Sequence, residues 1–193
     1  MSRFKILAAN PRRALAALAT VLVAVGVTGA SGANFNASSA NPGNVFTAGT
    51  LAMTNSNDGA AILTASNMRP GDAATYGVVD IKNTGSLSGP FTLSKGTVSD
   101  SDGSNPMSAK LNVSVVDCGT FASGTPTCDV ADPVVYTGTL AAMGTVGNPV
   151  GALGTYAADE QHRYRFGVQL DGSATNAYQG DSSEVEFLWT ATS

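Results

Sequence analysis

Few side chains of this sequence could do chemistry, and they lie far apart along the chain. His162 is the only histidine, and it stands between Glu160 and Arg163 at the start of a segment that alternates apolar and polar residues. Nucleophilic and metal-assisted catalysis both need convergent base, nucleophile or ligand groups. Neither a His-Glu-x-x-His pair nor a Gly-x-Ser-x-Gly turn is present. We therefore interpret His162 as a solvated residue at a strand end, and we expect no enzyme, no catalytic residue and no cofactor.

Two acidic patterns could bind a cation or transfer protons. The run 100–105 has the oxygen density of a calcium loop, with Asp100 and Asp102 as candidate ligands. It lacks the glycine at the sixth position and the glutamate at the twelfth that a calcium loop of the EF-hand type needs. We interpret it as a polar turn between strands, with calcium binding as the weaker alternative. Glu184 and Glu186 share one face of a strand, where they are expected to be solvated and to protect a sheet edge.

The only two cysteines, Cys118 and Cys128, are predicted to form a disulfide that closes a small loop. Two free thiols are the alternative. A structural zinc site needs four ligands, which two cysteines and one distant histidine do not supply.

The first 33 residues have the composition of a secretory signal peptide. A basic start, a short apolar run over 14–28 and small residues up to Ala33 predict cleavage between Ala33 and Asn34, with Ala30 as a second candidate. The apolar run is shorter than the roughly 20 residues that cross a bilayer as a helix. We therefore expect a secreted protein, in the extracellular matrix or on the cell surface, with an oxidising environment that suits a disulfide.

The charge balance of the mature chain excludes two classes of partner. The signal peptide holds four of the ten basic residues and none of the fourteen acidic ones, so the mature net charge is 6 − 14 = −8. Such a chain should repel nucleic acid and anionic membranes.

Short alternating segments predict an all-β fold. Apolar and polar residues alternate with a period of two over 109–115, 162–170 and 184–191, which is typical of strands with one buried face. Weaker strands are predicted over 45–53, 60–64, 75–82, 90–95 and 133–140. The Gly-rich stretch 144–157 is expected to be a loop. About eight antiparallel strands in residues 45–193 predict one β-sandwich domain.

Residues 34–44 differ from this domain. They are polar, and Phe35 is their only large apolar side chain, so we expect a flexible N-terminal arm.

Three patches of sequence together resemble one known family. They are Asn-Val-Phe-Thr-Ala-Gly-Thr-Leu over 44–51, Met-Arg-Pro-Gly-Asp over 68–72 followed by Asn-Thr-Gly over 83–85, and Tyr-Gln-Gly-Asp over 178–181. In order and spacing they resemble the TasA/camelysin family of secreted biofilm-matrix proteins. The resemblance implies a jelly-roll-like sandwich that polymerises head to tail into matrix fibres by donor-strand exchange.

In that interpretation the partner of the chain is a second copy of itself, with other matrix or cell-surface components as further candidates. The resemblance implies that the N-terminal arm is the donor strand, through Asn34, Phe35, Asn36, Ala37, Ser38, Ser39, Ala40 and Asn41. Two alternatives stay open. One is a monomeric secreted adhesin or carbohydrate-binding module, and the other is a camelysin-type metallopeptidase, which the sequence disfavours because it offers no recognisable set of metal ligands.

Overall fold

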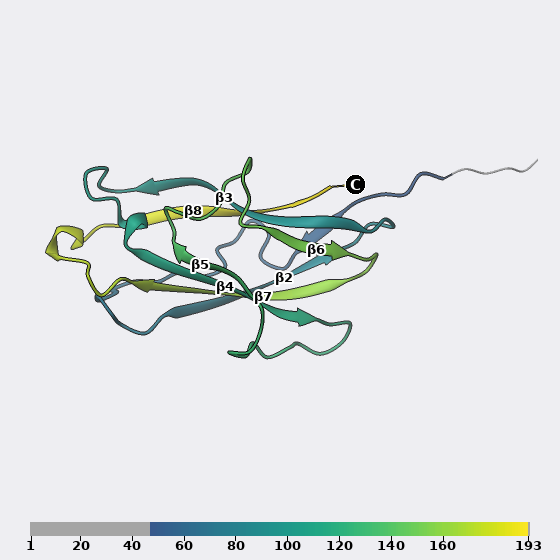
Figure 1. Ribbon diagram of the computed structural model, residues 1–193, viewed down its shortest axis with the longest axis horizontal. Helices are drawn as coiled ribbons and strands as arrows, with labels where there is room; N and C mark the ends of the chain where they lie inside the picture. The colour runs from purple at the N-terminus through teal and green to yellow at the C-terminus, as the bar shows by residue number, and fades with distance from the viewer. Residues whose placement is uncertain (1–46, 193) are drawn as a thin grey trace, which may run out of the picture. The chain divides into compact units, whose positions relative to one another are not determined.

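The alternating residues of 162–170 form β7 (Gln161–Leu170), a strand in the interior of a five-stranded sheet. Tyr164 and Phe166 are fully buried, as the period of two predicts, whereas Arg163 and Arg165 project from the outer face. The computed structural model describes residues 47–192, which form an all-β sandwich of two antiparallel sheets, drawn in Figure 1. The prediction of an all-β antiparallel sandwich of about eight strands is confirmed.

The larger sheet has the strand order β1-β2-β7-β4-β5 and the smaller sheet has the order β6-β3-β8. Neighbouring strands within each sheet are antiparallel. The strands besides β7 are β1 (Met53–Asn55), β2 (Thr75–Asn83), β3 (Gly89–Asp100), β4 (Leu111–Thr120), β5 (Val134–Thr139), β6 (Ala152–Tyr156) and β8 (Ser183–Ala191). Two short 3-10 helices, η1 (Met107–Ala109) and η2 (Asn176–Tyr178), lie in the connections.

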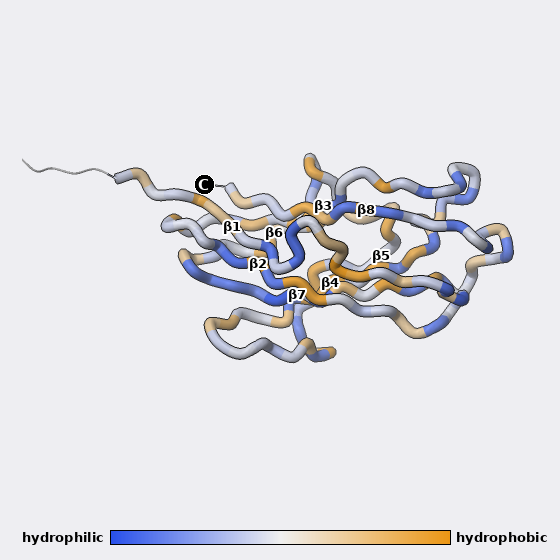
Figure 2. Tube along the Cα trace, turned by 180° about the vertical axis from the view of Figure 1, so that it is seen from behind, coloured by the Kyte–Doolittle hydropathy of each residue, from blue (hydrophilic) through white to orange (hydrophobic). Residues whose placement is uncertain are grey.

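The core lies between the two sheets. β2, β4 and β7 supply it from one side and β3 from the other, through fully buried side chains such as Ile81, Val115, Phe166, Phe91 and Leu93. Figure 2 shows the hydrophobic stretches of β4 and β7 in the interior of the molecule, with hydrophilic turns at its ends. Burying these side chains is the main stabilising term of the domain.

One buried polar residue joins the two sheets at one end. The Asn83 side chain, fully buried at the end of β2, donates from Nδ2 to the carbonyl oxygens of Leu87 (2.8 Å), Tyr156 (3.1 Å) and Ala157 (3.1 Å). Its Oδ1 accepts a hydrogen bond from the backbone N–H of Gly85 (2.9 Å). These bonds hold the β2–β3 turn against the end of β6, which belongs to the other sheet.

Three expectations about the strands are wrong. Of the segment 45–53, residues 47–52 are not a strand, because they bond the turn between β2 and β3 rather than a strand: the Thr50 N–H donates to the Ser86 side chain, and the Thr50 carbonyl accepts from the Leu87 N–H. The segment 60–64 is irregular and lies beside β2 without pairing with it. The stretch 144–157 contains β6, whose alternation is hidden by glycines and which buries only Tyr156.

The predicted signal peptide (1–33) and the arm (34–44) lie outside the described residues, so both stay predictions. Within residues 47–192, no helix is long and apolar enough to cross a membrane.

Candidate functional site

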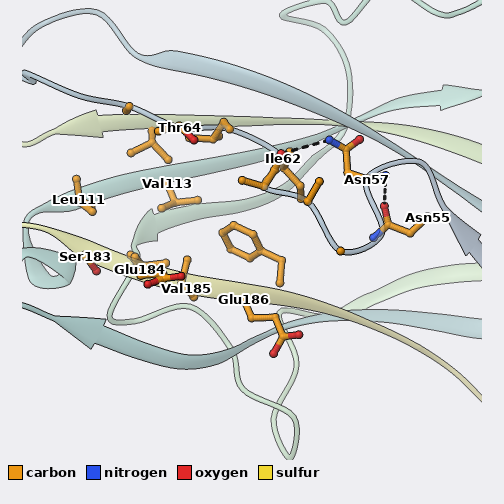
Figure 3. A pocket seen from close by; sticks show the side chains of 18 of the residues that line it. Asn55, Asn57, Ile62, Thr64, Leu111, Val113, Ser183, Glu184, Val185 and Glu186 are labelled. Atoms are coloured by element: carbon orange, nitrogen blue, oxygen red, sulfur yellow. Dashed lines mark hydrogen bonds between the residues drawn. The ribbon is translucent and has the colours of Figure 1, made fainter.

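An open groove of about 680 Å³ runs between the edge of β8 and the irregular segment 55–65 that follows β1 (Figure 3). Apolar side chains line it from both sheets. They include Ile62 and Leu63 from the irregular segment, Leu111 and Val113 from β4, Val168 from β7 and Phe187 from β8. Leu111 and Val113 are buried at the bottom of this groove, and Val168 is only partly buried.

β8 forms one border of the groove. It pairs with β3 through eight register positions, and within the described residues no strand pairs with its other edge. Such an edge presents backbone N–H and C=O groups that can pair with an added chain. Glu184 and Glu186 border this edge and are both exposed, as the alternation of β8 predicts, and the Glu186 carboxylate lies over β3 near Gly96.

The opposite border is an irregular segment rather than a strand. β1 pairs with β2 only over residues 53–55, and the chain then turns away. Asn57 stabilises this turn, since its backbone N–H donates to Asn55 Oδ1 (2.8 Å) and its Nδ2 lies 3.4 Å from the Ala61 carbonyl oxygen, as Figure 3 shows. Ile62 then passes so close to β2 that a Cβ added at Gly77 would lie 2.2 Å from the Ile62 carbonyl oxygen.

Two buried polar atoms beside the groove, on Ser183 and Trp189, are left without a partner among the described residues. The indole Nε1 of Trp189 is buried and has no hydrogen-bond partner among the described residues. A buried N–H without an acceptor costs roughly 1–3 kcal/mol.

A second cluster surrounds His162, and the expectation that this residue is solvated is wrong. Its side chain is only 13 % exposed. The ring stacks on Tyr156 with the ring centroids 4.2 Å apart, and it lies between the carboxylates of Asp117 and Glu160. Of these partners, the sequence indicates only Glu160, which is two residues away and on the same face of the chain. Asp117 lies on β4, and the pairing of β4 with β7 places it beside His162.

The remaining predicted site residues have local structural roles. Cys118 and Cys128 form the expected disulfide, which closes the loop after β4. Both carboxylate oxygens of Asp100 accept hydrogen bonds from Ser108, from its backbone N–H at 2.8 Å and its hydroxyl at 2.6 Å. Burial alone raises the pKa of Asp100, but the hydrogen bonds outweigh it and lower the pKa.

Asp102 caps its own turn, accepting hydrogen bonds from the Ser104 N–H at 2.8 Å and from Asn105 Nδ2 at 3.0 Å. Among residues 47–192, no group of three or more His, Cys, Asp or Glu side chains is placed to hold a metal ion. The arm residues 34–41 and the cleavage position after Ala33 lie outside the described part of the chain.

Comparison with known proteins adds no assignment, because no protein-family model and no curated protein matches this chain.

Proposed function

We propose that this protein is a secreted structural subunit of extracellular, biofilm-type matrix fibres. Copies join head to tail when the arm Asn34–Asn44 of one copy adds as a strand in the groove of the next. The observation that carries the proposal is the apolar groove of about 680 Å³ beside the unpaired edge of β8. The resemblance to the TasA/camelysin family of matrix proteins supports the same interpretation.

The dimensions of the arm suit this edge. An extended strand advances about 3.3 Å per residue, so the eight residues 34–41 reach about 26 Å and the nine residues of β8 about 30 Å. Main-chain hydrogen bonds drive strand addition and tolerate a polar sequence. Pro42 cannot donate to a ladder, so pairing would end at Asn41.

The side chains of the arm suit the groove as well. In an extended strand Phe35 and Ala37 point to the same face, where Phe35 can cover the apolar lining. The arm carries no charged side chain, so the carboxylates of Glu184 and Glu186 do not repel it. A head-to-tail contact that does not close on itself gives an open filament.

Deletion of the arm tests the proposal. We expect mature protein that begins at Asn34 to form filaments in negative-stain electron microscopy. Protein that lacks 34–44 should stay a folded monomer, with its fold checked by circular dichroism. Filaments that form equally well without the arm would refute the donor-strand mechanism.

A mixing experiment tests the groove separately. Ala61 is exposed and lines the groove, so Ala61→Arg should obstruct it while leaving the core intact. This variant keeps its arm, and the deletion variant keeps its groove. Neither alone should form filaments, whereas their mixture should give heterodimers that cannot grow further. A synthetic peptide of residues 34–44 should also bind the deletion variant one to one, and a peptide with Phe35→Ala should bind more weakly.

The same groove supports a second candidate function, a monomeric adhesin or carbohydrate-binding module. Its volume lies within the range of ligand pockets, and Phe187 and Trp189 contribute aromatic side chains to its lining. Glycan-array binding by a protein that stays monomeric at high concentration would favour this function over the fibre.

A further inference from the structure

Both ring nitrogens of His162 face carboxylates. Nδ1 lies 2.9 Å from Oδ2 and 3.1 Å from Oδ1 of Asp117, and Nε2 lies 3.2 Å from Oε1 of Glu160. A neutral imidazole has one N–H donor and one lone pair, so it can donate to only one of these partners. Its lone pair would then face the other carboxylate. The imidazolium donates to both, and this arrangement therefore matches the protonated ring.

The stacking partners of the ring also favour the positive charge. His162 lies against the Tyr156 ring, and the Tyr164 ring is roughly parallel to it at 6.1 Å between centroids. An aromatic face attracts a cation. Burial raises the pKa of both tyrosines, so they stay neutral and their hydroxyl groups bond to each other. Among residues 47–192, the charged groups that act on the ring are the carboxylates of Asp117 and Glu160, with no cation beside them.

The three charged residues connect parts of the chain that belong to different sheets. Asp117 is on β4 and His162 on β7, both in the larger sheet. Glu160 lies in the turn that leads from β6, in the smaller sheet, into β7. The other oxygen of Glu160 accepts the backbone N–H of Ala157 (2.6 Å), which fixes this turn. Losing the charge at His162 would therefore loosen the connection between the sheets.

From this geometry we propose that Asp117, His162 and Glu160 form a pH-sensitive clamp that fastens the β6–β7 turn to β4. The clamp is closed while His162 is an imidazolium, and it opens as that proton is lost. It lies outside the groove, so it does not depend on how the groove is used.

The direction of the pH dependence follows from the pKa of His162. Burial lowers this pKa, but the hydrogen bonds and charges of Asp117 and Glu160 outweigh burial and raise it above the ordinary value of 6.5. The stabilisation by the clamp is therefore complete below about pH 6.5, the value in the unfolded chain, and is lost as the pH rises through the raised value. Within that window the folding equilibrium constant should fall by up to about tenfold per pH unit.

Nuclear magnetic resonance of the whole protein tests the clamp directly, because the chain has only one histidine and its ring signals need no further assignment. We expect the folded protein to show a His162 pKa above 6.5, with both ring nitrogens protonated at pH 6. A pKa at or below 6.5 would overturn the proposal. This measurement uses the unmodified sequence, so it does not depend on whether any variant folds.

Variants then identify the partners. Asp117→Asn and Glu160→Gln keep the size of each side chain but remove its charge, so each should lower the pKa of His162. Asp80→Asn is the matched control, since Asp80 is a partly buried carboxylate that pairs with Arg163 rather than with the histidine. In thermal unfolding between pH 6 and 9, His162→Gln should lose the pH dependence assigned to the clamp. An unchanged slope in that variant would also overturn the proposal.

Discussion

Replacing Asn83 by alanine should destabilise the sandwich more than any other single polar substitution at that end of the molecule. Its amide group meets three carbonyl oxygens and one N–H inside the protein, and no water reaches it. An amide has only two N–H donors for the three carbonyls, so the side chain supplies about three effective hydrogen bonds with its acceptor included. At about 1 kcal/mol each, the loss is about 3 kcal/mol.

The assay is thermal unfolding followed by circular dichroism. For a domain of this size, 1 kcal/mol corresponds to roughly 2–4 °C, so Asn83→Ala should lower Tm by about 10 °C. Asn176→Ala is the matched control, because Asn176 is exposed and its change should stay within about 0.5 kcal/mol. If Asn83→Ala cost less than about 1 kcal/mol, the interpretation of Asn83 as the joint between the sheets would be refuted.

Further substitutions test other parts of the fold. Replacing both Cys118 and Cys128 by serine opens a loop with a sequence separation of 10, and loop-closure entropy predicts a loss of about 2.7 kcal/mol in chemical denaturation. A loss below about 1 kcal/mol would show that the unfolded chain is already restricted there. Gly77→Ala places a Cβ against the Ile62 carbonyl, so we expect a cost of about 1–3 kcal/mol and faster hydrogen exchange around Ile62. Unchanged exchange would mean that the irregular segment does not depend on this close approach. Arg163→Ala breaks a bidentate, largely buried ion pair and leaves the Asp80 carboxylate without its partner, so it should cost about 1–3 kcal/mol by urea unfolding; a loss below about 0.5 kcal/mol would contradict this role.

The sequence predicts a strand well where one face is buried and the other is solvated. Alternation therefore located β7 and β8 to within one residue at each end. The sequence does not predict β6, because Gly151 and Gly154 interrupt the alternation of apolar and polar residues. Both glycines adopt positive φ angles, and Tyr156 is the only buried residue of the strand. For the apolar run 60–64 the sequence predicts a strand, but the segment is irregular. Its side chains are needed to line the groove, so an apolar composition did not mean sheet pairing.

The surroundings of the candidate sites could be predicted only in part. Glu160 and His162 are close in sequence, and their spacing by two indicates a shared face of the chain. Asp117 reaches His162 because the pairing of β4 with β7 shifts between Asp117 and Thr120, an irregularity that no local pattern reveals. The groove likewise depends on the difference in size between the two sheets, which results from tertiary pairing rather than from any single segment.

That difference in size has a thermodynamic consequence. The smaller sheet has three strands and the larger has five, so part of the larger sheet's apolar face is covered only by an irregular segment. Anything that fills this side binds the native state and not the unfolded chain, so it raises stability by RT ln(1 + [L]/Kd). With a second copy as the filler, the melting temperature becomes a function of protein concentration. Dilution alone would then lower it, even though no contact within the subunit had changed.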